Sequence, residues 1–171
     1  MRLMNKSADG WVAAWNSTIT GDVLLGKDAT VWFGTVIRGD VARVAIGERT
    51  NVQDNAVVHC DTGVENIIGC DVVIGHGAIV HGKSVGDGAL IGMGATLLSR
   101  TTVGRGCLIA AGAVVPPDMQ VPDGMMAMGV PAKIVRPVNE EEVKYMKWLV
   151  GHYVELAEKY VRGEIQRLVA E

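Results

Sequence analysis

Three histidines in this chain, His59, His76 and His81, have residue types and spacings that suit a metal site. Imidazole is a frequent ligand of zinc, and three imidazoles leave a fourth position on the ion open for chemistry. An aliphatic residue occupies every sixth position around them, as at Ile74 and Val80. Three unrelated surface histidines are the alternative, but they would not be expected to fall at matching places in a repeat. We therefore interpret the three residues as ligands placed by that repeat.

The repeat is a hexapeptide in which an aliphatic residue is often followed by glycine, with a small residue four positions later. Examples are Leu25-Gly26 with Ala29, Ile74-Gly75 with Ala78, and Ile91-Gly92 with Ala95. A fixed short period of this kind predicts a stacked solenoid. The composition agrees, because 22 glycines against one Phe and three Tyr favour a narrow interior filled by small and β-branched side chains. We expect an all-β solenoid over residues 12–135.

A different period begins after Pro137. Asn139 with Glu142 three positions later forms an N-cap pair, and apolar residues then recur at intervals of three and four as far as Tyr160. This pattern predicts an amphipathic C-terminal helix over residues 139–161. Since an isolated helix of this length is marginal, we expect it to pack on the solenoid or across a neighbouring subunit.

The repeat also predicts which residues stack on one another. Three hexads make one turn of a triangular coil, so residues about eighteen positions apart lie on neighbouring rungs. With a four-residue insertion after Cys60, the alignment puts Arg38, His59 and His81 in one column. His76 belongs to a different column, one rung beyond Asp54.

A single chain is not expected to complete the metal site. The five residues from His76 to His81 are nearly extended, which separates their Cα atoms by roughly 15 Å, whereas metal–nitrogen bonds are only about 2 Å long. A head-to-tail contact can bring His76 of one chain to His59 and His81 of the next, and such a contact closes as a three-fold ring. We therefore expect a homotrimer with shared sites, and Arg38 and Asp54 can pair across the same contact.

Charge and cysteine content limit the partners. A net charge of −3 and a pI near 5.8 offer nothing to a polyanion, so nucleic acid is not an expected partner. The three cysteines have no CxxC spacing, and residues 1–15 contain no apolar run long enough for a signal peptide. We expect a protein of the reducing cytoplasm without a membrane partner.

These motifs resemble those of the γ-class carbonic anhydrases and their shorter bacterial and archaeal homologues, and the resemblance covers nearly the whole chain. The motifs are Ile37-Arg38-Gly39-Asp40, Asn51-Val52-Gln53-Asp54 followed by His59, Gly75-His76-Gly77, Val80-His81-Gly82, and the exit Gly129-Val130-Pro131-Ala132. The resemblance implies a left-handed parallel β-helix and a homotrimer that binds zinc, or alternatively iron or cobalt. The ligands would be His59 and His81 of one subunit and His76 of the next.

The resemblance also implies roles for other residues. The family's arginine and aspartates map onto Arg38, Asp40 and Asp54, its glutamine maps onto Gln53, and Tyr153 matches a helix tyrosine that approaches the metal in several relatives. The implied reaction is the reversible hydration of CO2 to bicarbonate, in which the metal lowers the pKa of a bound water and Gln53 orients the resulting hydroxide. The alternative interpretation of Tyr153 is a buried core residue.

Two departures from the family pattern bear on activity. The best-known active members carry a glutamate directly after the aspartate of the first motif, where this chain has Val41. They also carry a long acidic loop between the first and second histidines, which is here reduced to Asp61–Asn66. Asp61 or Glu65 would then have to carry the proton. Two rival functions stay open: a hexapeptide-repeat acyl- or acetyltransferase that needs no metal, and a trimeric metal-binding protein with little hydration activity.

Overall fold

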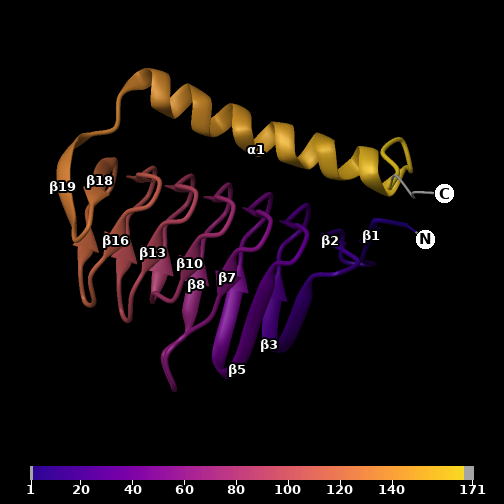
Figure 1. Ribbon diagram of the computed structural model, residues 1–171, viewed down its shortest axis with the longest axis horizontal. Helices are drawn as coiled ribbons and strands as arrows, with labels where there is room; N and C mark the ends of the chain where they lie inside the picture. Colours follow the sequence, from indigo (N-terminus) through magenta and orange to yellow (C-terminus); the bar gives the residue numbers. More distant parts are fainter. Residues whose placement is uncertain (1, 168–171) are drawn as a thin grey trace.

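Short parallel strands follow the hexapeptide repeat, and together they form a solenoid with one helix along its side (Figure 1). The computed structural model describes residues 2–167. Strands two or three residues long form most of the rungs, and each pairs in parallel with the strand one turn further on, as Ile79 and Val80 pair with Thr96 and Leu97. The predicted all-β solenoid of hexapeptide repeats with a C-terminal α-helix is therefore confirmed.

The strands collect on three faces. The first face is a nine-stranded sheet whose inner strands are parallel and whose two outermost strands, β1 and β19, pair antiparallel as caps. In spatial order it contains β1 (Met4–Lys6), β2 (Val12–Ala14), β4 (Thr30–Val31), β6 (Asn51–Val52), β9 (Val73–Ile74), β12 (Leu90–Ile91), β15 (Leu108–Ile109), β18 (Met125–Gly129) and β19 (Ala132–Pro137).

The second and third faces are joined by two long strands that turn the corner between them, β3 (Thr18–Leu25) and β5 (Val36–Ile46). The second face continues with β7 (Val57–Val58), β10 (Ile79–Val80), β13 (Thr96–Leu97) and β16 (Val114–Val115). The third face continues with β8 (Asn66–Ile68), β11 (Ser84–Val85), β14 (Thr102–Val103) and β17 (Gln120–Val121).

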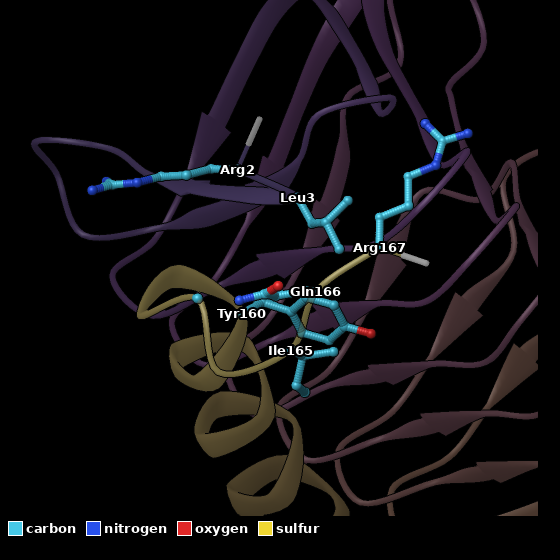
Figure 2. A pocket seen from close by; sticks show the side chains of 7 residues that line it. Arg2, Leu3, Tyr160, Ile165, Gln166 and Arg167 are labelled. Carbon is cyan, nitrogen blue, oxygen red and sulfur yellow. The ribbon is translucent and has the colours of Figure 1, made fainter. Parts of the chain in front are cut away.

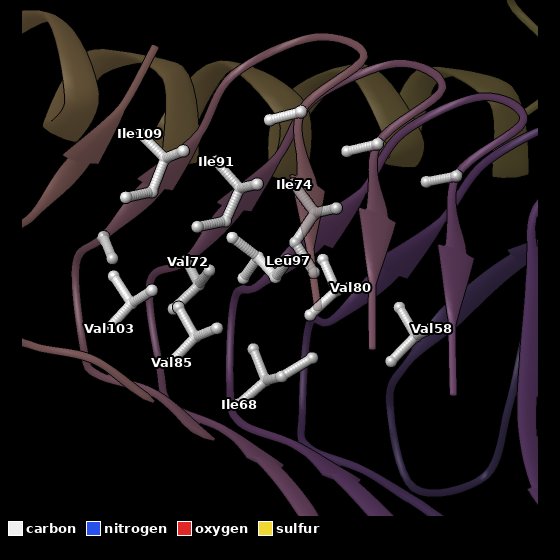
Figure 3. Packing of buried hydrophobic residues seen from close by; sticks show 14 of the residues in the cluster. Val58, Ile68, Val72, Ile74, Val80, Val85, Ile91, Leu97, Val103 and Ile109 are labelled. Atoms are coloured by element: carbon white, nitrogen blue, oxygen red, sulfur yellow. The ribbon is translucent and has the colours of Figure 1, made fainter. Parts of the chain in front are cut away.

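The interior is a stack of aliphatic side chains, one from each face on every rung (Figure 3). Ile74 and Ile91 of the first face, and Val80 and Leu97 of the second, are fully buried. Burial of one such side chain is worth about 1.5–3 kcal/mol. Because every rung contributes to the same stack, the register of each strand is fixed, and so are the polar residues that follow it.

The glycine of each hexad is required by the closeness of the rungs. A Cβ added to Gly75 would lie 2.7 Å from the backbone nitrogen of Met93, which is closer than real Cβ contacts allow. The same is true of Gly47, whose Cβ would lie 2.5 Å from the carbonyl carbon of Gly69. Glycine at this position therefore lets neighbouring turns approach to strand-pairing distance.

Helix α1 (Glu140–Val161) begins at a capping box. The Asn139 side chain accepts from the backbone N–H of Glu142, and the Glu142 carboxylate accepts from the backbone N–H of Asn139. The helix runs back along the first face toward the N-terminal end of the solenoid (Figure 1). Tyr153, Ala157 and Tyr160 of the helix pack against Trp32 and Met4 in a second apolar cluster. Within residues 2–167, no helix is both long and apolar enough to cross a bilayer.

Candidate metal centre

Two of the three histidines stand side by side at the end of the second face. Val58 pairs with Val80, so His59 and His81, the next residues along each chain segment, occupy neighbouring rungs. Their backbone N–H groups continue the ladder to Val80 and Leu97. The imidazole ring centroids are 5.2 Å apart and the ring planes are inclined by 41°. This separation lets both rings reach one ion through bonds of about 2 Å.

Arg38 and Asp40 lie one rung below His59. The Arg38 guanidinium donates to Asp40 over 2.6 Å, and the other Asp40 oxygen lies 3.1 Å from Nε2 of His59. The hydrogen bond from Arg38 holds the pKa of Asp40 below its usual value. The predicted pairing of Arg38 with Asp54 concerns a contact between subunits, and within the chain Arg38 pairs with Asp40 instead.

The backbone between Arg38 and Asp40 admits no side chain. A Cβ on Gly39 would lie 2.3 Å from the carbonyl oxygen of Asp22, because β3 and β5 remain paired as they round the corner. Glycine at this position therefore lets the two strands stay paired, and this pairing holds the side chains of Arg38 and Asp40 beside His59.

A carboxylate also faces His81. Asp61 Oδ1 lies 3.0 Å from Nε2 of His81 and accepts from the Ser99 hydroxyl over 3.1 Å. The hydrogen bond from His81 lowers the pKa of Asp61. Asp61 belongs to the short inserted segment before β8, which is tied down by the buried Asn66, whose amide donates to the carbonyls of His59 and Val80. The sequence suggested Asp61 only as a proton carrier and missed Asn66.

His76 stands apart from this pair, at the end of β9 on the first face. Its Nδ1 lies 2.8 Å from Asp54 Oδ2, and the hydroxyl of Tyr153 lies 3.3 Å from its Nε2. The second Asp54 oxygen accepts from the backbone N–H of Phe33, which fixes the carboxylate. Burial of the Tyr153 side chain between the helix and the solenoid raises its pKa. Tyr153 is thus partly packed in the second apolar cluster and also touches a predicted ligand.

Gln53 lies beneath the helix and is only 4% exposed. Its side-chain oxygen accepts from the backbone N–H of His76 over 3.2 Å, and its Nε2 donates to Asn51 over 3.0 Å. Gln53 therefore belongs to the His76 side of the molecule. Asn51 was not singled out from the sequence, although its place two residues before Gln53, on the same side of the strand, is a usable signal.

One chain therefore carries two separate polar clusters. The paired-histidine cluster contains His59, His81 and the carboxylates of Asp40 and Asp61, and the single-histidine cluster contains His76 with Asp54. Among the residues that the structure describes, no three His, Cys, Asp or Glu side chains of this chain converge well enough to hold a metal ion. A complete three-imidazole site would need both clusters to meet.

Another hollow lies away from these clusters. A cavity of about 630 Å³ sits between the N-terminal segment and the end of the helix, where Arg2, Leu3, Tyr160 and Ile165 line it (Figure 2). None of the predicted site residues borders it.

Comparison with known proteins identifies relatives over most of the chain. The family of bacterial transferase hexapeptides (six repeats) matches residues 82–117. The chain is 43% identical over 150 residues to a carbonic anhydrase of Geobacillus kaustophilus, a match that covers 88% of this chain and 82% of the relative. It is 38% identical over 149 residues to the mitochondrial gamma carbonic anhydrase 2 of Arabidopsis thaliana, covering 84% of this chain.

The chain spans only about half the length of that plant relative, 54%. Among solved structures, a hexapeptide transferase family protein from Anaplasma phagocytophilum superposes with a TM-score of 0.77 at 34% identity, covering 93% of this chain and 98% of the other. The long match to the Geobacillus protein, together with the histidine and aspartate clusters, leads to one conclusion. This chain belongs to the γ-class carbonic anhydrase family of hexapeptide-repeat proteins.

Proposed function

We propose that the protein is a metal-dependent carbonic anhydrase that interconverts CO2 and bicarbonate at sites shared between the subunits of a homotrimer. One observation carries the proposal. The chain has a pair of imidazoles on one face and a single imidazole on another, each backed by carboxylates, and neither cluster is complete alone. A head-to-tail ring would join them into three equivalent sites.

Exposed apolar residues beside both clusters support the shared site. Ile79 precedes the paired-histidine cluster by two residues and is 43% exposed, and Met93 lies one rung beyond His76 and is 59% exposed. Large apolar side chains exposed on a surface favour association, because burial releases about 25 cal/mol per Å² of apolar area. A contact that brings the two clusters together would also bury these residues.

The donor set fits a zinc ion, with iron or cobalt as alternatives. His59, His81 and the neighbouring subunit's His76 would hold the ion, and neutral imidazole suits each of these metals. When bound, such an ion supplies Lewis acidity that lowers the pKa of a coordinated water. The chain's own contribution is orientation. Asp54 holds Nδ1 of His76, which leaves Nε2, beside the Tyr153 hydroxyl, as the nitrogen that would bind the ion. Asp40 and Asp61 restrain the other two rings through Nε2 of His59 and Nε2 of His81.

Proton release is the step for which the chain is least equipped. Val41 cannot carry a proton, and Asp61 is already engaged by His81 and Ser99. Glu65 is exposed on the inserted segment. We therefore expect hydration to be limited by proton transfer to solvent, and a diffusible base to accelerate it.

The rival functions each rest on a specific observation. The match to transferase hexapeptides favours an acyl- or acetyltransferase, and Val41 favours a metal-binding trimer that hydrates CO2 slowly. The histidine and carboxylate clusters favour the carbonic anhydrase, because a transferase that relies on one histidine as general base has no use for three imidazoles on two faces. Three cysteines without a disulfide fit a reducing compartment, and we propose the cytoplasm.

The deciding experiment is anaerobic purification followed by metal analysis, determination of oligomeric state, and a CO2 hydration assay with and without imidazole buffer. We expect one metal ion per chain, a trimer, and a rate that rises with imidazole. A metal-free protein that binds coenzyme A would instead indicate the transferase. A metal-loaded trimer with no hydration at any imidazole concentration would indicate the non-enzymatic alternative.

A further inference from the structure

An apolar slot of about 250 Å³ runs between the first face and the N-terminal half of α1, and it reaches the single-histidine cluster. The solenoid contributes Val73, Leu90 and Leu108 to its walls, and the helix contributes Tyr145, Leu149 and Tyr153. Gln53 and His76 border the slot as well. The slot therefore has a long apolar part and one polar end.

The sequence explains why the slot is there. Trp32, Gln53, Gly75, Gly92 and Ala110 occupy equivalent positions on successive turns, as the ladder from Trp32 to Val52 and from Gln53 to Ile74 shows. Trp32 fills the space under the helix, where its ring lies 5.1 Å from that of Tyr153. On the turns beyond Gln53 the equivalent positions hold only glycine or alanine, so no large side chain of the solenoid fills the space under the helix. Glycine is required at Gly92, whose Cβ would lie 2.5 Å from the backbone nitrogen of Ala111.

The polar end offers hydrogen-bond donors. Since the backbone N–H of His76 donates to Gln53, the atom facing it must be the amide oxygen, and the amide nitrogen must face Asn51. Gln53 thus uses one of its two N–H groups and keeps the other at the end of the slot. The side chain of Gln53 is more than nine-tenths buried. An unused buried donor favours an anionic or carbonyl oxygen as its partner.

The size of the slot exceeds what CO2 or bicarbonate needs. A water molecule takes about 30 Å³ of liquid volume, so the slot has room for roughly eight waters, whereas CO2 has three heavy atoms. We propose that the slot is a subsite for the hydrocarbon part of a small monocarboxylate, whose carboxylate binds among Gln53, His76 and Tyr153. The assignment rests on the proposed function in one respect, that the carboxylate takes the place of bicarbonate.

Binding of a series of straight-chain acids to the full-length protein tests the proposal. Acetate, butyrate and hexanoate are titrated by ligand-observed NMR into metal-free and metal-loaded protein, with hexylamine as the control for the head group. Each added methylene should tighten binding up to about threefold to fourfold, the factor that corresponds to burial of one CH2. Hexylamine should bind more weakly than hexanoate because the polar end presents donors.

Two variants locate the binding. Ala110→Phe should fill the slot and remove the dependence on chain length, whereas Leu149→Ala should remove one wall and weaken hexanoate at least threefold without changing acetate. The Leu149 variant keeps the test open if the Phe variant does not fold. Lys144→Ala changes an exposed residue on the same helix and should leave the affinities for hexanoate and acetate unchanged.

Equal affinity for the three acids in the unmodified protein would overturn the proposal, as would hexanoate affinity unchanged in both slot variants. Hexylamine binding as tightly as hexanoate would overturn the carboxylate assignment. Metal content and CO2 hydration are measured on the same samples. A failure of the proposed function would appear as missing metal or missing CO2 hydration. The affinities of the three acids would still show whether the slot binds their hydrocarbon chains.

Discussion

Subunit mixing gives the sharpest test of the shared site. The variants His76→Ala and His81→Ala each lack one ligand, and neither chain alone can form a three-imidazole site. His76 and His81 are separated by nearly extended backbone and contact different carboxylates, Asp54 and Asp61. In a randomly mixed trimer, a site is intact when the paired-histidine cluster comes from the first variant and His76 from the second. With equal amounts of both chains, about one quarter of the sites meet this condition in a three-fold head-to-tail ring.

The assay co-expresses the two variants with different affinity tags, isolates trimers that carry both tags, and measures metal per chain. Because the double-tag selection removes pure trimers, the measured value should be somewhat above one quarter of the unmodified protein. A matched control mixes the unmodified chain with the double variant without tag selection. A shared site predicts about one quarter of the metal and a site within one chain predicts about one half. Purified hybrid trimers that contain no metal would refute the shared site. A control mixture that retains one half of the metal of the unmodified protein would refute it as well.

Three further predictions concern the scaffold. Gly39→Ala should destabilise the protein by about 1–3 kcal/mol in urea unfolding and weaken metal binding, because its Cβ would meet the Asp22 carbonyl at 2.3 Å. Gly151→Ala should stabilise it by about 0.5–1 kcal/mol, because within residues 2–167 no atom beyond the neighbouring helix backbone lies within 4 Å of the new Cβ. The hydrogen bonds from Arg136 lower the pKa of Glu142 from 4.5 to about 2, so its stabilising contribution is present above pH 4.5 and lost as the pH falls toward 2. The stability difference between the unmodified protein and Glu142→Gln should therefore shrink over that range, and a constant difference would contradict the assignment.

Much of the fold could be predicted because a repeat leaves few alternatives. Once hexads stack, a slip of one residue would expose the buried aliphatic column, so the register of Val58 with Val80 follows from the pattern. The neighbouring positions of His59 and His81 follow in turn, even across the inserted segment. The antiparallel caps β1 and β19 do not belong to the repeat, and nothing in its period indicates them.

The contacts between polar side chains were less accessible to sequence reasoning. Gln53 was expected to orient a nucleophile, and the structure has its amide engaged by His76 and Asn51 under the helix. That arrangement depends on where α1 crosses the first face. The crossing is set by the packing of aromatic rings such as Trp32 and Tyr160, which lie 128 positions apart in the chain and 5.8 Å apart in space. Packing of this kind has no local signal.

Two departures from the hexapeptide repeat explain why two carboxylates lie in the paired-histidine cluster. The long strand β5 and the segment before β8 both depart from the hexad there, and the two are joined by the backbone N–H of Gly63, which donates to Val41. These two segments bring Asp40 to His59 and Asp61 to His81, so each imidazole of the pair has its own carboxylate. The short segment has a consequence for proton transfer. A carboxylate held by two partners cannot swing toward solvent as a mobile carrier must. The same contacts that orient His81 therefore favour a site that depends on buffer for its turnover, which is the behaviour that the imidazole titration measures.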